Sequence, residues 1–454
     1  MTISIKCFGQ TLVAASFLLA GAAQAGLSAE EVARLGRDLT PLGAEKAGSA
    51  DGSIPAWNGG LTTPPPGFEP EKGYINPFAA EKPLVTINAA NADRYKDKLT
   101  EGHYAMLKKY GSFKMHVYPT HRTAAYPQEI YDLIKKNANA AQLSDGEITC
   151  TGCSVVPFPI PKSGRQVMWN HLYRYRGGGV ERDLATAPVL ADGTILYYNK
   201  PRMTWAQPTD FIDKENVPAG LVSSFVFFQT APAQVEGRAG VVKSYSNPQA
   251  RPLDFYFYNA GLRRVRKMPE TPNDYFDDAL EGLRTADQFD GFFGSLVSYD
   301  FKLVGKKEMI VPYNNYKLSD RSLKYTQILT KNHPNPEVLR FEKHRVWVVE
   351  GTLRDGQRHI YSRRTWYIDE DSWTVLHDDA YDSRGQLWRV NDVYTMQYYN
   401  AVVPYIQSWA IADLHSGAYI AEWLDNEEKR PIRFGVKSRW ADHSAEGLKR
   451  MGTK

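Results

Sequence analysis

The sequence predicts a mainly β protein with helices, of the α+β class, built around a large antiparallel sheet. The first observation is a run of four strand patterns joined by short polar turns, at residues 345–353, 359–368, 373–381 and 387–396. The second is the alternation within them: Trp366 and Ile368 share one face and Tyr367 the other, as a half-buried strand requires. One face of this sheet should be apolar, and whatever covers that face should determine the function.

The turns between these strands contain the residues that tight turns need. Asp355 and Gly356 form the first turn, and the others, at 369–372 and 382–385, are rich in Asp and Ser. Glycine adopts left-handed backbone conformations without strain, and Asp and Ser side chains cap backbone amides. The four strands should therefore be neighbours connected by hairpins.

The N-terminus has the layout of a cleavable secretory signal, residues 1–25. Lys6 precedes an apolar stretch at 12–23, and the small residues Ala23 and Ala25 mark the cleavage site. This stretch is too short to span a bilayer, and no later segment has the roughly 18 consecutive apolar residues that a span needs. We therefore expect an exported, soluble protein that begins at Gly26.

The charge distribution gives no indication of a nucleic-acid partner. The chain has 55 basic and 51 acidic residues, spread without long runs of one sign. Aromatic side chains are abundant, with 27 Tyr, 19 Phe and 10 Trp. Such amphipathic rings suit a surface that meets apolar ligands or lipid, although a large Tyr-rich sheet would also contain them.

The mature chain is expected to have two parts. Residues 26–90 should form an extended, Pro- and Gly-rich segment that follows a short helix starting with a capping box at Ser28. Residues 91–454 should form the body, in which helical patterns at 91–110 and 127–143 are candidates to cover the sheet and 404–426 is a C-terminal helix followed by a polar tail. Further strands are expected at 167–175, 194–199, 221–230, 241–245, 253–258, 262–266, 298–304 and 308–311.

Cys150 and Cys153 are the sharpest local motif. In an oxidising compartment two cysteines this close in sequence should form a disulfide. A redox-active pair needs a helix start that the prolines at 157, 159 and 161 forbid, and a zinc site needs ligands that no second cysteine pair supplies. A disulfide is therefore expected, with redox and zinc roles as alternatives.

The sequence offers little support for catalysis, and no cofactor or metal is expected. There is no His-Glu-x-x-His pattern, no Gly-x-Ser-x-Gly elbow and no phosphate-binding loop. His377 lies near several acids that could supply acid, base or calcium-ligand groups, although acids at sheet turns commonly cap backbone amides. These acids are Asp369, Glu370, Asp371, Asp378, Asp379 and Asp382.

Two stretches resemble a known family. Residues 253–266, an aromatic strand followed by a tight turn and a basic strand, resemble the central hairpin of the LolA and LolB periplasmic lipoprotein carriers of Gram-negative bacteria, and so do residues 366–387. When residues 311–314 and 344–350 are considered as well, the chain more closely resembles a larger family catalogued only as a domain of unknown function. Members of that family are described as outer-membrane lipoprotein-sorting-like and as encoded near lipid-type exporters.

The resemblance implies a LolA/LolB-like incomplete β-barrel whose concave apolar face is covered by helices. It also implies a periplasmic location, lipophilic cargo, and an inner-membrane lipid-type exporter and an outer-membrane protein as partners. The chain has no lipobox of the LolB kind, so it should not be lipid-anchored in that way.

We therefore expect a periplasmic binding or carrier protein for a lipid or another hydrophobic molecule, acting without covalent chemistry. A 16-carbon chain costs roughly 13 kcal/mol to hold in water, at about 0.8 kcal/mol per methylene, so a carrier must enclose most of it. The cavity candidates are strand positions selected by alternation: Phe225, Phe227, Phe255, Phe257, Trp347, Val349, Trp366, Ile368, Trp373 and Val375. A periplasmic hydrolase and a structural component of an envelope transport complex are the alternatives.

Overall fold

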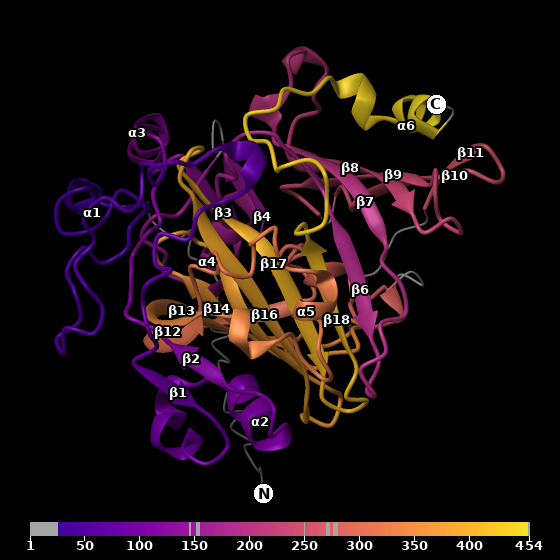
Figure 1. Ribbon diagram of the computed structural model, residues 1–454. Coiled ribbons are helices and arrows are strands. Elements are labelled where there is room, and N and C mark those ends of the chain that lie inside the picture. Colours follow the sequence, from indigo (N-terminus) through magenta and orange to yellow (C-terminus); the bar gives the residue numbers. More distant parts are fainter. Residues whose placement is uncertain are drawn as a thin grey trace, which may run out of the picture.

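Two antiparallel sheets dominate the structure, a computed structural model that describes residues 26–144, 147–150, 155–248, 250–268, 273–275 and 280–452 (Figure 1). The larger sheet has the strand order β1-β2-β13-β14-β15-β16-β17-β18-β6, and β12 also pairs with β13. Its strands are β1 (Val85–Ile87), β2 (Met115–Val117), β6 (Ala185–Val189), β12 (Tyr299–Pro312), β13 (Phe341–Leu353), β14 (Arg363–Asp369), β15 (Val375–Tyr381), β16 (Leu387–Tyr398), β17 (Val403–Asp413) and β18 (Tyr419–Leu424).

The smaller sheet continues the larger one around a bend. Its order is β11-β10-β9-β8-β7-β5. The bend is at Leu184, because the chain pairs with β7 just before this residue and with β18 just after it. Its strands are β5 (Val180–Asp183), β7 (Lys200–Ala206), β8 (Leu221–Ala231), β9 (Ala239–Tyr245), β10 (Asp254–Asn259) and β11 (Arg264–Lys267).

The two sheets form an incomplete barrel, which confirms the predicted fold class. Within the described residues, β11 and β12 each pair on one side only, so the curved sheet does not close. A separate hairpin joins β3 (Ala141–Ser144) to β4 (Glu147–Cys150).

Helix α4 (Gly164–Tyr173) lies against the concave face. Its N-cap Ser163 accepts a hydrogen bond from the backbone N–H of Gln166, and every residue from Gln166 to Tyr173 is buried. The expectation of a strand at 167–175 is therefore wrong. Because the helix is buried on all sides, its polar residues Gln166, Asn170 and His171 do not mark a solvent-exposed face, and the sequence lacks the period that distinguishes helix from strand.

Two other helices cover outer faces of the sheets, whereas α3 (Gln128–Lys136) adds Tyr131 and Ile134 to the main core. Helix α2 (Glu101–Lys109) packs through Met106 and Leu107 on the convex face of the large sheet, against Val390 and Tyr394 of β16. Helix α6 (Ala445–Gly452) buries Leu448 on the outer face of the small sheet. The remaining α-helices are α1 (Ala29–Arg34), which has the predicted capping box, and α5 (Tyr325–Ile328).

The expected helix at 404–426 is also wrong, because β17 and β18 occupy this range. Every residue of both strands is buried, so neither shows the apolar and polar alternation of a half-exposed strand. Asp413 caps the turn between them by accepting hydrogen bonds from the backbone N–H groups of His415 and Ser416. The C-terminal helix is instead α6, at 445–452.

Most other strand predictions are confirmed. The four patterns at 345–396 correspond to β13 to β16, and those at 221–266 correspond to β8 to β11. The two patterns at 298–311 are a single strand, β12, whose register shifts between Leu303 and Gly305. Residues 194–199 form only isolated bridges, through Ile195 and Asn199.

Some expectations fall outside the described residues. These are the signal at 1–25 and the disulfide, since Cys153 is not described. Among the described helices, none combines the length and the apolar character that crossing a membrane requires.

Candidate functional site: an aromatic cavity

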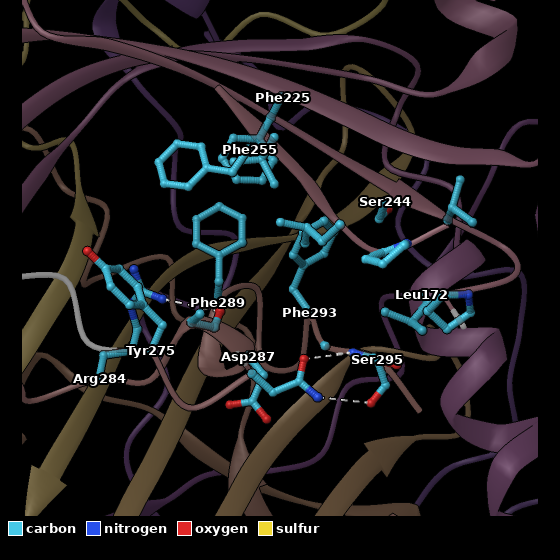
Figure 2. A pocket seen from close by; sticks show the side chains of 18 of the residues that line it. Leu172, Phe225, Ser244, Phe255, Tyr275, Arg284, Asp287, Phe289, Phe293 and Ser295 are labelled. Atoms are coloured by element: carbon cyan, nitrogen blue, oxygen red, sulfur yellow. Dashed lines mark hydrogen bonds between the residues drawn. The ribbon is translucent and has the colours of Figure 1, made fainter. Parts of the chain in front are cut away.

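A cavity of about 600 Å³ lies between the small sheet, helix α4 and the segment 280–298, with β18 at one side. Figure 2 shows Phe225 and Phe255 on one side of this space, Phe289 and Phe293 opposite them, and Leu172 of α4 at another edge. Ligand pockets in proteins typically have volumes of about 300–1,000 Å³ and mostly apolar walls. The cavity therefore has the size and lining of a site for a hydrophobic molecule.

One wall comes from alternate residues of the small sheet. Phe225 and Phe227 of β8 and Val242 of β9 face the cavity. The residues between them, such as Val226 and Val241, pack under α6 on the other face. This sheet is therefore apolar on both faces, one filled by a helix and the other bordering the cavity.

The opposite wall is a loop with three phenylalanines. Phe289 stacks on Phe225 with ring centroids 4.9 Å apart, and it also meets Phe293 at 5.8 Å and Trp423 of β18 at 5.5 Å. Phe292 turns away from the cavity and packs on Trp366 at 5.3 Å. The loop therefore covers the core with one ring and lines the cavity with two.

Buried ion pairs hold this loop in place. The two carboxylate oxygens of Asp290 accept hydrogen bonds from Arg174 and Arg176, which follow α4, each at 2.7 Å. Burial on its own would raise the pKa of Asp290, but the two arginines outweigh it and hold that pKa below its ordinary value. Asp290 is thus charged, and the loop that carries Phe289 and Phe293 is fixed to the end of α4.

Both acids found among the described lining residues are paired. Asp287 accepts a hydrogen bond from Arg364 at 2.9 Å and lies 3.2 Å from Nε2 of His359. Burial would raise its pKa, but these two partners lower it to about 2. Oε1 of Glu422 lies 2.6 Å from Nε of Arg284 and accepts a hydrogen bond from the Trp409 indole. Neither acid is therefore an uncompensated charge in an apolar site.

The mouth of the cavity is marked by its exposed lining residues. On one side of the mouth the exposed residues are Arg251 and Pro252, which precede β10, and Tyr275. On another side the turn at 356–358 is exposed. Because these residues both line the cavity and contact solvent, a ligand can enter between them.

The structure brings three of the ten predicted cavity residues to this site: Phe225, Phe227 and Phe255. Phe257 is on the same strand as Phe255, with ring centroids 6.2 Å apart, but does not line the cavity. Trp347 is partly buried and stacks on Trp373. The remaining predicted residues are fully buried in the main core: Val349, Trp366, Ile368, Trp373 and Val375.

Sequence reasoning missed the loop wall and the part of α4 that lines the cavity. The signal for the loop was present, since three phenylalanines fall within five residues at 289–293 in a segment without strand or helix periodicity. Such rings in a loop must pack on something, and here two of them line the cavity. For Trp169 and Leu172 of α4 no signal was available, because this segment has the pattern of a strand.

His377 lies on the other face of the large sheet, under α2, and of the six acids predicted near it only Asp379 is bonded to it, whereas Asp378 pairs with Arg364. Nδ1 of His377 lies 2.7 Å from Oδ1 of Asp392, and Nε2 lies 2.8 Å from Oδ1 of Asp379. Nε2 of His103 from α2 also lies 2.7 Å from Oδ1 of Asp392. The side chains of His103, His377, Asp379 and Asp392 are almost completely buried, and none of the four lines the cavity.

Comparisons with known proteins identify relatives along the whole chain. A family model described as a protein of unknown function, DUF1329, matches residues 86–449. An uncharacterized protein of Pseudomonas aeruginosa is 43% identical over 454 residues, which is 99% of this chain and 99% of that protein.

Two solved structures show weaker similarity. A domain from Vibrio parahaemolyticus, named for outer-membrane lipoprotein sorting, is 14% identical with a TM-score of 0.44 and covers 64% of this chain and 99% of its own. A DUF1329 family protein from Desulfovibrio piger is 13% identical with a TM-score of 0.41 and covers 60% of this chain and 91% of its own.

Proposed function

This chain belongs to the DUF1329 family of proteins of unknown function, and from its cavity we propose that it is a binding or carrier protein for a lipid or another hydrophobic molecule. The observation that carries the proposal is the aromatic cavity between the small sheet and the 280–298 loop. The protein acts by enclosing its cargo, with no covalent step.

The energetics favour enclosure of an apolar chain. Moving methylenes from water into an apolar site gains about 0.8 kcal/mol each, and five phenylalanine side chains provide apolar walls here. The same methylenes are equally apolar in a membrane, so exchange between the cavity and a bilayer costs little. Loading and unloading are then reversible, and partners give the transfer its direction.

The periplasm is the proposed location, with the segment 1–25 as the export signal. An inner-membrane lipid-type exporter and an outer-membrane protein are the proposed partners. The segment 26–90 is proposed as an extended attachment to a body at 91–454. A hydrogen bond from the indole of Trp373 to the carbonyl of Leu42 supports this proposal, because it joins the segment to the body.

A matched pair of variants tests the proposal. Phe255→Asp introduces a charge at the cavity wall, whereas Phe257→Asp introduces it two residues along the same strand, outside the cavity. Both positions are half-buried, so the cost to the fold should be similar. Titration with the neutral fluorescent probe N-phenyl-1-naphthylamine should show saturable binding to the wild type and the Phe257→Asp variant and its loss in Phe255→Asp. Equal binding by all three proteins, or no binding to the wild type, would contradict the proposal.

The hydrolase alternative receives no support from His377. Burial alone would lower its pKa, but the charges and hydrogen bonds of Asp379 and Asp392 raise it to about 10. A protonated imidazole cannot act as a general base at neutral pH. It also lies beneath α2, on the face of the sheet opposite the cavity, where no substrate reaches it.

A further inference from the structure

We infer that the cargo is an anionic amphiphile, whose tail fills the cavity and whose acidic headgroup is bound at the mouth by Arg251 and Arg358. The inference rests on the proposed carrier function and names the ligand class of that same cavity. The headgroup chemistry is that of a carboxylate or a phosphate, both of which the planar guanidinium binds with two parallel hydrogen bonds.

The distribution of charge around the cavity carries the inference. Among the residues that the structure describes, three arginines line it, Arg251, Arg284 and Arg358, against two acids, Asp287 and Glu422. Both acids are buried at 1% and 4% exposure, away from the mouth. Among the described lining residues, every exposed charged side chain is therefore an arginine.

The arginines differ in how far they are committed to other partners. Arg284 is bound to Glu422 through its Nε, and its guanidinium lies over Phe289, 5.6 Å from the ring centroid. It therefore neutralises an acid of the wall and is not the headgroup site.

Arg251 is only weakly paired. Its nearest acid, Asp254, is 4.0 Å away and is itself bound to Nζ of Lys267 at 2.7 Å. The guanidinium of Arg251 lies 3.8 Å from the ring centroid of Tyr245, so its plane is supported while its side chain remains 46% exposed. Stacking on an aromatic ring orients a guanidinium without using its N–H donors.

Arg358 is exposed in the turn that forms another part of the mouth, and it pairs with none of the described residues. Its neighbour Asp355 and Tyr275's neighbour Asp274 do not line the cavity. Within the described part of the chain, neither guanidinium therefore has an acid closer than 4.0 Å, and both present N–H donors at the entrance to an apolar space. That arrangement matches a molecule with a long apolar tail and one anionic end.

Competition with N-phenyl-1-naphthylamine separates the ligand classes, using 16-carbon ligands that differ only at the head. The probes are hexadecanoate, hexadecyl phosphate, hexadecanol and hexadecyltrimethylammonium, each below its critical micelle concentration. We expect the two anions to bind more tightly than the alcohol by roughly fivefold, the combined effect of two exposed charge pairs, and the cation to bind least well. A preference for one anion over the other then identifies the headgroup as a carboxylate or a phosphate.

Variants assign the preference to the two arginines. Arg251→Ala and Arg358→Ala should each reduce the anion-to-alcohol ratio by a few fold, and Arg358→Glu should move the preference towards the cation. Arg354→Ala is the matched control, because Arg354 is exposed nearby and pairs with Asp300 at 3.3 Å but does not line the cavity. All four substitutions are at exposed side chains, so folding should be retained.

The outcomes distinguish this inference from the carrier proposal. Equal affinity for anions and alcohol, or ratios unchanged in the variants at Arg251 and Arg358, would overturn the anionic class while leaving the carrier function in place. Binding of none of the ligands would overturn both.

Discussion

The rings of Phe227 and Phe255 lie 6.4 Å apart, centroid to centroid, on strands β8 and β10. Strand β9 runs between them and has Gly240 opposite Phe227. A Cβ atom on Gly240 would lie 2.3 Å from Cζ of Phe227 and 3.1 Å from Cε2 of Phe255. The missing side chain therefore lets both rings lie over β9 and leaves the space in front of them open.

Gly240→Val should narrow the cavity, because the added side chain displaces the ring of Phe227 into it. We expect weaker binding of N-phenyl-1-naphthylamine by about tenfold, which is a loss of about 1.4 kcal/mol in binding free energy. Fatty alcohols of increasing length should reach their best affinity at a shorter chain than in the wild type. Gly111→Val is the control, since a Cβ on Gly111 meets no other atom within 4 Å. An unchanged length profile in Gly240→Val would show that the probe lies elsewhere.

Trp366→Ala should lower the free energy of unfolding and leave the affinity for the ligand almost unchanged. Trp366 is fully buried, meets Phe292 edge to face and has the guanidinium of Arg364 4.7 Å from its ring centroid. Truncating such a side chain costs about 3–5 kcal/mol. Urea unfolding measures this cost, and probe affinity in the absence of urea should change little. Phe255→Ala should show the reverse, with a small loss of stability and a clear loss of affinity.

The pH dependence of the free energy of unfolding should report the protonation of His377. Its pKa of about 10 in the folded protein exceeds the ordinary value of 6.5, so the folded state holds this proton more tightly than the unfolded state does. Its contribution is therefore fully present below pH 6.5 and is lost as the pH rises from 6.5 to about 10.

The free energy of unfolding of the wild type should accordingly decrease between pH 7 and 10. In His377→Gln it should be lower at pH 7 by a few kcal/mol and vary less over this range. His415→Gln, at an exposed histidine, should behave like the wild type. Parallel pH curves for the wild type and His377→Gln would contradict the charged state assigned to His377.

Gly102→Ala should loosen helix α2 from the sheet. A Cβ at this position would lie 2.1 Å from Oδ1 of Asp379 and 2.7 Å from Cγ1 of Val390. Neither neighbour can move freely, because Asp379 is bound to His377 and Val390 is in the core under α2. We expect a loss of about 1–3 kcal/mol in unfolding free energy and faster hydrogen exchange of α2 amides. Normal exchange in α2 would show that the helix docks without this close approach.

The strands that could be predicted from the sequence are those with one distinctive turn and one alternating pattern. Trp366, Tyr367 and Ile368 alternate between the inner core and the outer face, as expected. The strands β17 and β18 and the helix α4 could not be distinguished in this way, because they are buried on every side. Their polar residues, such as Gln407, Glu422 and Asn170, are buried too and mark no exposed face. When every face of an element is buried, its sequence lacks the periodic alternation of polar and apolar residues on which a secondary-structure prediction depends.

The cavity could be predicted only in part, for a related reason. Alternation indicates which face of a strand points inward, and it did so for Phe225 and Trp366 alike. It does not indicate whether that face meets another side chain or an open space. Phe292 covers Trp366, whereas Phe289 and Phe293 pack beside Phe225 and leave a cavity next to these rings. Both outcomes depend on the path of the 280–298 loop. That path is set by pairs distant in sequence, such as Arg174 with Asp290.

X-ray diffraction at the bromine edge from crystals soaked with 16-bromohexadecan-1-ol tests the central claim most directly. The account predicts an anomalous bromine peak inside the space bounded by Phe225, Phe255 and Phe289, and its absence in crystals of Phe255→Asp. Bromine found only on the outer surface, or no peak at a concentration that saturates the fluorescent-probe competition, would contradict it.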